Sequence, residues 1–241
     1  MEYESFSFKE TNLRFRVRHR ERMIQCILHQ RRILDAYIRR YPLFLTSFEP
    51  VPPLPDAPPI ALTMHRASEL TGVGPMAAVA GAFAEAAARE GWGVVENGGD
   101  VFLLSDTPVV LGVYSGKTPL SGRVGFRIDP DRMPLAVCSS SGKMGHSLSL
   151  GKADLVTVFA GSGALADAAA TLGGNLVQSA EDIPTVLEQL CRIPGVEAAW
   201  IEVDGKVGFQ GDIPPLVKLS DDTFPRKITR DLRSGVHLED L

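Results

Sequence analysis

Two segments of this chain consist largely of alanine and glycine, and they limit its possible folds more than any other feature. The first runs from Gly72 and Gly74 through Pro75 into the alanine-rich stretch 82–88, and the second covers 161–172. Glycine permits a tight turn and proline suits the first position of a helix, so each segment predicts a glycine turn that leads into a helix. Because small side chains allow close packing, we expect two such helices, each facing its own strands in one of two similar layers.

Short apolar runs separated by turn residues predict that much of the remaining chain is strand. The pair Asn97-Gly98 between two apolar runs is the strongest short hairpin signal. The continuous apolar run 155–159 predicts a fully buried strand. Further strands are expected at 109–114, 123–128 and 135–138, with hairpins at 3–17 and 198–209. The expected fold class is α+β, with strands and helices in two layers.

The ends of the chain are predicted as follows. Residues 1–241 are expected to form a single domain that begins with a hairpin and a long amphipathic helix (1–42) and continues through a proline-rich connection (49–59). A short strand and turn are expected at 59–67, a helix end at 173–175, a helix over 183–192 capped by Asp182, and a polar tail beyond Pro214.

Composition excludes several classes of function. A net charge of -4 gives no reason to expect nucleic acid or an anionic membrane as a partner. The three cysteines lack a CxxC pair, so neither a disulfide framework nor a zinc site is indicated. No signal peptide and no stretch of ~18 apolar residues is found, and we therefore expect a cytoplasmic protein without membrane contact.

The stretch 138–175 has the composition of a binding site. It contains a Ser/Gly loop, a histidine, an apolar strand, a second glycine loop and a helix with Asp167 and Thr171. Glycine-rich loops let backbone N–H groups approach a ligand, and the start of a helix favours bound negative charge. The ligand expected from these residues is an anion.

Five motifs in their order along the chain carry a resemblance to a known family. They are GPMAAVAGAFAEAA (74–87), ENGGD (96–100), SSSG (139–142) followed by His146, GKAD (151–154) and ADAAAT (166–171). This order resembles the ApbE-like superfamily of FAD:protein FMN transferases. The N-terminal helix and the pattern of Tyr37, Pro42 and Phe44 resemble an uncharacterised branch of it. The resemblance implies an ApbE-like architecture, related to the T-fold, with two sheets.

The resemblance also implies a magnesium ion beside the pyrophosphate of a flavin dinucleotide. Asp167 and Thr171 match the metal ligands of the family. Residues at i and i+4 share one face of a helix, and a hard cation accepts carboxylate and hydroxyl oxygens as ligands. Backbone carbonyls at 76–78 are expected to complete the coordination.

The remaining site residues follow from the same resemblance. Gly98, Gly99 and Asp100 are expected to line the pocket for FAD or FMN. His146 is expected to act as general acid or base because its pKa lies near neutrality. Donors to phosphate are expected from Ser139, Ser140, Ser141 and Gly142.

Three functions are compatible with these motifs. The first is a transferase that acts on a flavin or nucleotide phosphoanhydride with Mg²⁺ and uses an acceptor protein. The second is a non-transferring cofactor-binding or accessory protein in sulfur assimilation or redox metabolism. It is favoured by Ala80 in place of the transferases' lysine, and by a shortened histidine loop at 145–154. The third makes Cys138 a nucleophile with His146 as its base. A homodimer is expected from the strand-rich middle of the chain.

Overall fold

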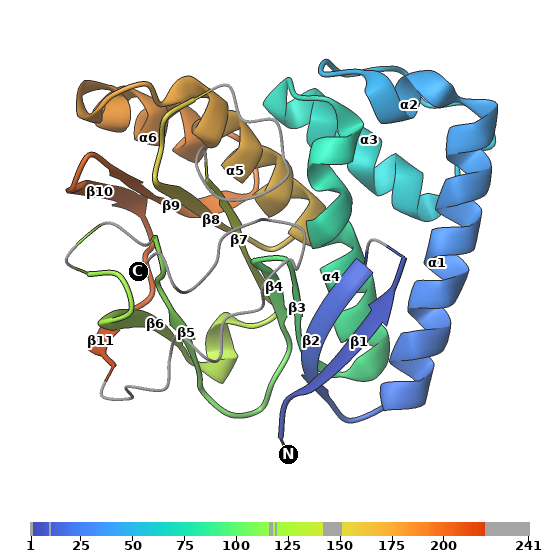
Figure 1. Cartoon of the computed structure of the whole chain (residues 1–241), viewed down its shortest axis with the longest axis horizontal. Helices are drawn as coiled ribbons and strands as arrows, with labels where there is room; N and C mark the ends of the chain where they lie inside the picture. The colour runs from blue at the N-terminus through green and yellow to red at the C-terminus, as the bar shows by residue number, and fades with distance from the viewer. Residues whose placement is uncertain (1, 10, 116–117, 119, 142–150, 220–241) are drawn as a thin grey trace, which may run out of the picture.

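The strands of the computed structural model, which describes residues 2–9, 11–115, 118, 120–141 and 151–219, form two sheets (Figure 1). The larger sheet has the order β1-β2-β3-β4-β7-β8-β9-β10, and the smaller has the order β11-β6-β5. All neighbouring strands in both sheets are antiparallel. The strands are β1 (Glu4–Phe8), β2 (Thr11–Val17), β3 (Gly93–Asn97), β4 (Asp100–Leu103), β5 (Val109–Gly112), β6 (Val124–Ile128), β7 (Leu135–Ser140), β8 (Leu155–Ala160), β9 (Val196–Val203), β10 (Lys206–Gly211) and β11 (Leu216–Lys218).

Helices cover one face of the larger sheet. Helix α4 packs on β3 and β4, α5 packs on β7 and β8, and α6 packs on β9 and β10, while α1 lies against α4 and α3 against α5. The helices are α1 (Arg20–Arg40), α2 (Pro42–Thr46), α3 (Pro59–Thr71), α4 (Val79–Gly91), α5 (Gly163–Leu176) and α6 (Ile183–Cys191). Along the chain, each half of the larger sheet therefore consists of two strands, then helices, then two further strands.

The smaller sheet covers the other face of the larger one, so the molecule has an apolar core on each side. Phe126 of β6 packs edge-on against Phe159 and Trp200 in the core between the sheets. Strand β8 is buried along its whole length because it is covered on both faces. This double cover explains why its sequence is a continuous apolar run rather than an alternating one.

Helices α4 and α5 cross at two glycines. A Cβ atom added to Gly81 would lie 2.1 Å from the carbonyl oxygen of Gly163, and one added to Gly163 would lie 2.2 Å from that of Gly81. Both separations are below any real Cβ contact, so the two backbones touch directly. The crossing fixes the β3–β4 half of the sheet relative to the β7–β8 half.

Much of the predicted secondary structure is confirmed. The fold class is α+β, the long amphipathic helix expected within 1–42 is present as α1, and the hairpin at Asn97-Gly98 is formed by β3 and β4. The two alanine-rich helices face their own strands, as predicted. These strands, however, are two halves of one sheet rather than two separate layers.

The strand predicted at 59–67 is wrong, because this segment begins helix α3. Its buried positions include Ile60, Ala61, Met64 and Ser68, which lie on one face at helical spacing. Pro59 occupies the first position of the helix, and Gly72 ends it in a left-handed conformation.

The helix end predicted at 173–175 is also wrong, since α5 continues to Leu176. A Cβ at Gly173 would lie 2.8 Å from Val156 Cγ1, and a Cβ at Gly151 would lie 1.9 Å from the carbonyl oxygen of Gly174. These glycines therefore serve close packing within and against the helix instead of ending it.

Two further predictions near the C-terminus need correction. The Asp182 carboxylate does not cap α6 but accepts N–H bonds from Gln178 and Ser179, at 2.9 and 2.8 Å, in the short turn before that helix. The tail beyond Pro214 is not wholly irregular, because β11 pairs with β6.

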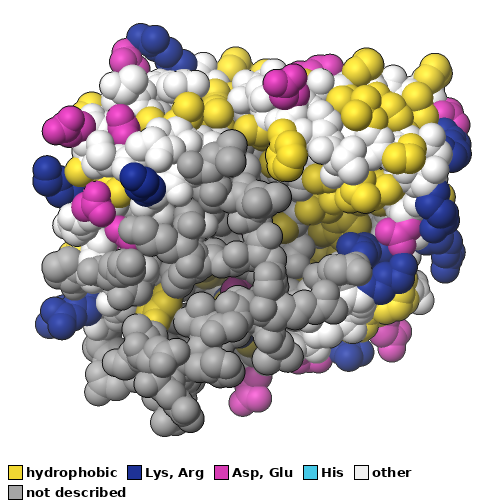
Figure 2. All heavy atoms as spheres, turned by 45° about the horizontal axis from the view of Figure 1, so that its top comes forward, with side chains coloured by type: hydrophobic (Ala, Val, Ile, Leu, Met, Phe, Trp, Pro, Cys, Tyr) yellow, Lys and Arg dark blue, Asp and Glu magenta, His cyan; other side chains and the backbone are white. Residues whose placement is uncertain are grey.

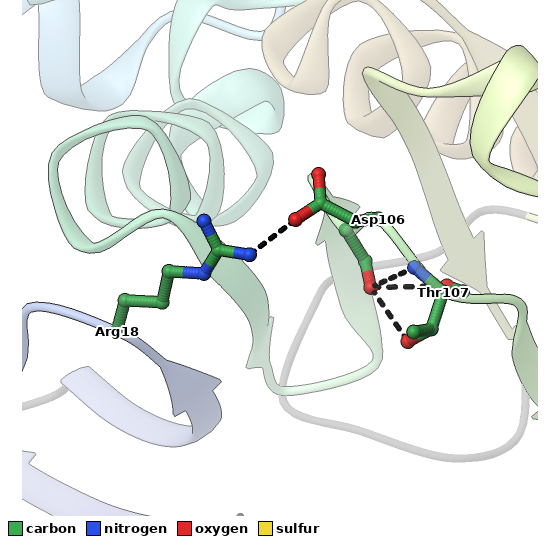
Figure 3. A network of polar contacts seen from close by, with 4 residues as sticks. Arg18, Asp106 and Thr107 are labelled. Carbon is green, nitrogen blue, oxygen red and sulfur yellow. Dashed lines mark hydrogen bonds and ion pairs between the residues drawn. The ribbon is translucent and has the colours of Figure 1, made fainter.

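A surface ion pair joins the end of β2 to the connection between β4 and β5. Figure 3 shows the Arg18 guanidinium directed at the carboxylate of Asp106. Next to Asp106, the Ser105 hydroxyl accepts the N–H of Thr107 at 3.2 Å. Both charged side chains are exposed, so we expect ~0–1 kcal/mol from the pair.

Exposed apolar side chains gather on the outer surface of α2 and α3, toward the upper right of Figure 2. They are Leu43, Leu45, Phe48, Leu62 and Leu70. Among the described residues, a membrane-spanning length of apolar helix is reached only by α3 taken together with residues 75–91, and these two pieces meet at a bend of 108°.

The crossing predicts unequal effects of glycine substitutions. Gly81→Ala should lower the free energy of unfolding by ~1–3 kcal/mol, because the added methyl group separates the two helices. Gly161→Ala is the matched control, since the nearest atom of the described residues, Glu197 Oε1, lies 4.0 Å from the added atom. Urea unfolding measures both variants. Equal stability of Gly81→Ala and the wild type would contradict the direct backbone contact.

Candidate functional site

The β3–β4 turn stands next to the start of α4. Gly98 and Gly99 have φ angles of +65° and +104°, which favour glycine, and a Cβ at either would meet no atom of the described residues within 4 Å. The Asn97 side-chain amide donates to the carbonyl oxygen of Ala80 at 3.1 Å and so ties the turn to α4. The described part of the chain therefore leaves space for a ligand beside the two glycines.

Asp100, the first residue of β4, is buried. Its Oδ1 atom accepts the backbone N–H of Ser139 at 3.2 Å. Burial, followed by the negative charge of Asp167, raises the pKa of Asp100 well above its usual value, and Glu96 adds to this effect. The charges that act on Asp100 are acidic, so its environment favours a proton or a cation.

Asp167 projects from the second turn of α5 into the crossing with α4. Its Oδ2 atom accepts the N–H of Gly81 at 2.9 Å. Burial raises the pKa of Asp167 to about 7, while hydrogen bonds from the N–H groups of Gly81 and Ala80 oppose this rise. Thr171 lies four residues further on, half-buried and on the same face of the helix.

Glu85 makes the reciprocal contact on α4. Its Oε2 atom accepts the N–H of Gly163 at 2.8 Å, so the start of α5 already holds a carboxylate of the chain itself. Its Oε1 atom accepts from Arg89 Nε, also at 2.8 Å. The Glu85 carboxylate thus occupies the anion-binding position at the start of α5. A bound phosphate would need hydrogen-bond donors from other parts of the chain.

The predicted serine donors lie on both faces of the sheet. The Ser139 hydroxyl lies 2.8 Å from that of Thr157, on the side of the smaller sheet. Cys138 belongs to the core on the helix side, and Ser140 shares that side by the alternation of the strand. Ser141 follows β7 at its exit. Gly142 and His146 lie outside the described residues.

Cys138 is poorly suited to act as a nucleophile. Its thiol is buried and donates to the carbonyl oxygen of Gly163 at 3.6 Å. Burial, and then the charges of Asp100 and Asp167, raise the pKa of this thiol well above its usual value. Since the thiolate is the reactive form, the burial and raised pKa of this thiol argue against Cys138 as a nucleophile.

The donor set of Asp100, Asp167 and Thr171 fits a hard divalent cation. Its atoms are carboxylate and hydroxyl oxygens, and Mg²⁺ is usually held by one or two carboxylates together with phosphate and water. Among the described residues no cluster of three or more His, Cys, Asp or Glu side chains forms a metal site. A magnesium ion here would therefore depend on a phosphate ligand for part of its coordination.

Sequence patterns assigned no role to Glu85, although Gly81 and Glu85 repeat the i, i+4 spacing of Gly163 and Asp167. They indicated Asp100 as a residue lining the pocket, but not that Asp167 raises the pKa of this carboxyl. The crossing of α4 and α5 brings Glu85 to Gly163 and Asp167 to Gly81, although these residues lie far apart in the sequence.

The raised pKa of Asp167 predicts how stability depends on pH without metal. Between the usual pKa of 3.8 and about 7, the folded protein holds a proton that the unfolded chain has released. The free energy of unfolding in EDTA should therefore fall as pH rises through this range, and Asp100, whose pKa is also raised, adds to the fall.

Asp167→Asn should reduce this decline in urea titrations between pH 4 and 8, and the exposed control Asp131→Asn should keep it. A decline that runs parallel in Asp167→Asn and the wild type would show that Asp167 is not the group involved.

Comparisons with known proteins agree with the fold and the motifs. A family model described as "AbpE bacteria" matches residues 4–192. A UPF0280 protein of Methanocaldococcus jannaschii is 41% identical over 221 residues, which cover 87% of this chain and 91% of the relative. A UPF0280 protein of Methanopyrus kandleri is 47% identical over 195 residues, which cover 77% and 79%.

Solved structures extend the likeness to the fold. The ApbE protein of Thermotoga maritima aligns with a TM-score of 0.54 at 15% identity, over 87% of this chain and 97% of that one. The flavinyl transferase ApbE of Pseudomonas stutzeri, in its apo form, aligns with a TM-score of 0.56 at 12% identity, over 87% and 94%. The fold is thus that of the ApbE proteins, and the chain belongs to the AbpE bacteria family.

Proposed function

We propose that this protein binds a flavin dinucleotide, or a related nucleotide phosphoanhydride, together with Mg²⁺ between α5 and the β3–β4 turn. One contrast at the helix crossing carries the proposal. Glu85 has a counter-ion four residues on in Arg89, whereas Asp167 has Thr171 at the equivalent position and Asp100 as an acidic neighbour. A bound cation would supply the positive charge that this acidic pair attracts.

Different residues would bind the cation and the nucleotide ligand. Asp167 is already oriented by the N–H groups of Gly81 and Ala80, and a carboxylate has further lone pairs with which to bind a cation. Thr171 would add a hydroxyl oxygen, and the space that the described residues leave beside Gly98 and Gly99 would admit the ligand. Mg²⁺ would neutralise charge on the pyrophosphate.

The proton transfer of the proposed reaction is assigned to His146, whose pKa would normally lie near neutrality. The phosphate groups would accept hydrogen bonds from Ser140, Ser141 and Gly142, at and beyond the end of β7. The described part of this segment is consistent with that role, since β7 leads out of the sheet next to the strand of Asp100.

The second candidate is a cofactor-binding protein that does not transfer the flavin. Ala80 favours it, because the transferases that the chain resembles carry a lysine just before the equivalent of Gly81. The structure gives Ala80 a backbone role, in which its carbonyl oxygen accepts from the Asn97 side chain. The flavin transferases of Pseudomonas stutzeri and Vibrio cholerae share the fold and favour the first candidate.

Thermal unfolding tests the binding proposal. Mg²⁺ and FAD added together should stabilise the protein more than the sum of their separate effects, because each completes the site of the other. At ligand concentrations ~100-fold above Kd the gain is about 2.7 kcal/mol, or a rise of ~5–10 °C in Tm. Asp167→Asn and Thr171→Val should lose the joint effect, and Asp131→Asn should keep it. An unchanged Tm of the wild type with both ligands would refute the proposal.

Incubation with FAD, Mg²⁺ and a candidate acceptor protein separates the two functions. A transferase would leave covalent FMN on the acceptor, detected as a mass increase, whereas a binding protein would not. In the transferase case His146→Ala should lower the rate ~10²-fold or more while FAD binding persists. The acceptor protein, the homodimer and the cytoplasmic location stay predictions.

A further inference from the structure

Each of the two central helices has an N-terminal N–H group that donates to a carboxylate of the other helix. Neither the residue before α4 nor the residue before α5 caps its own helix through a side chain. Instead, Gly81 of α4 donates to Asp167, and Gly163 of α5 donates to Glu85. The two hydrogen bonds flank the glycine contact, so they hold both helices in one relative position.

We propose that Glu85 is a positioning residue for the cation-binding carboxylates, an inference that rests on the proposed function. Glu85 Oε2 accepts the N–H of Gly163, the first residue of α5, at 2.8 Å, and Asp167 lies one turn further along that helix. A Cβ at Gly163 would lie only 3.1 Å from Glu85 Cβ, so the fit between this side chain and the helix start is close. Glu85 thereby determines where Asp167 meets Gly81.

A second chain of contacts runs from Glu85 toward Asp100. Glu85 pairs with Arg89, and the Arg89 guanidinium lies over the ring of Phe102, 5.1 Å from its centroid. Phe102 is fully buried and stands two residues after Asp100 on β4, on the same face of the sheet. One side chain therefore connects to the two elements that carry the two acids.

This arrangement explains why a glutamate suits position 85. A carboxylate accepts two hydrogen bonds at once, one from the backbone of α5 and one from Arg89. Glutamine would keep one acceptor oxygen and lose the ionic partner, and alanine would lose both contacts. The effect on a bound cation should follow the same order.

Divalent-cation binding tests the role directly, with Mn²⁺ alone as the probe and free Mn²⁺ measured by electron paramagnetic resonance. Glu85→Ala should bind Mn²⁺ ~10-fold or more weakly than the wild type, and Glu85→Gln should fall between them. Glu90→Gln is the matched control, because Glu90 lies on the same helix and pairs with Arg22 at the surface. It should bind Mn²⁺ as the wild type does.

Two further measurements separate positioning from general loss of stability. Leu34→Ala removes a buried side chain from α1 and should lower Tm without changing Mn²⁺ affinity. Hydrogen exchange of the Gly81 amide reports its bond to Asp167 without any metal. This exchange should be ~10-fold faster in Glu85→Ala than in the wild type, while amides of β9 stay unchanged.

The outcomes are distinct. A folded Glu85→Ala protein with wild-type Mn²⁺ affinity overturns the inference, whatever its Tm. If Glu85→Ala does not fold, Glu85→Gln decides: weaker Mn²⁺ binding supports the role and wild-type binding overturns it. If the wild type binds no Mn²⁺ either alone or with FAD present, the proposed function fails. Faster exchange at Gly81 in Glu85→Ala then still supports positioning of Asp167, and unchanged exchange overturns it.

Discussion

The direct contact between the backbones of α4 and α5 is the constraint on which the rest of the structure depends. It requires glycine at positions 81 and 163, because a methyl group on either would overlap the opposite carbonyl oxygen. Close approach also removes water from the N–H groups at the two helix starts, and carboxylates from the opposite helix replace it. The geometry of the crossing thus determines where Asp167 and Glu85 can stand.

The electrostatic consequences of this contact differ on its two sides. Glu85 lies toward Arg89 and is neutralised within α4. Asp167 lies toward Asp100; burial raises the pKa of both carboxyls, and the negative charge of Asp167 raises that of Asp100 further. An acidic pair of this kind decreases stability at neutral pH unless a proton or cation accompanies it. This asymmetry links the packing of two helices to the proposed binding of a magnesium ion and a phosphoanhydride.

Local sequence patterns predicted the helices and strands better than they predicted the tertiary packing around them. The spacing of apolar residues predicted α1, and the Asn97-Gly98 turn predicted the β3–β4 hairpin, because both signals are contained within a few residues. Residues 59–67 were misassigned because a helical stripe buried by tertiary packing resembles a short apolar strand in sequence. The glycines at 173–174 were misread because their packing partners, Val156 and Gly151, come from other elements.

The same limit applies to the candidate site. The motif order indicated the family and drew attention to Asp167, but the contact of Glu85 with Gly163 joins residues far apart in the sequence. No local sequence pattern indicates that Asp167 raises the pKa of Asp100, since this effect depends on how α5 lies over β4 and β7.

Anomalous diffraction from crystals grown with Mn²⁺ and FAD would test the central claim most directly. The account predicts one manganese peak at ~2.1 Å from a carboxylate oxygen of Asp167, with phosphate oxygens of FAD completing its coordination. It also predicts that Gly81 still donates to the other oxygen of Asp167. A peak remote from Asp167, or bound FAD without manganese beside this carboxylate, would contradict it.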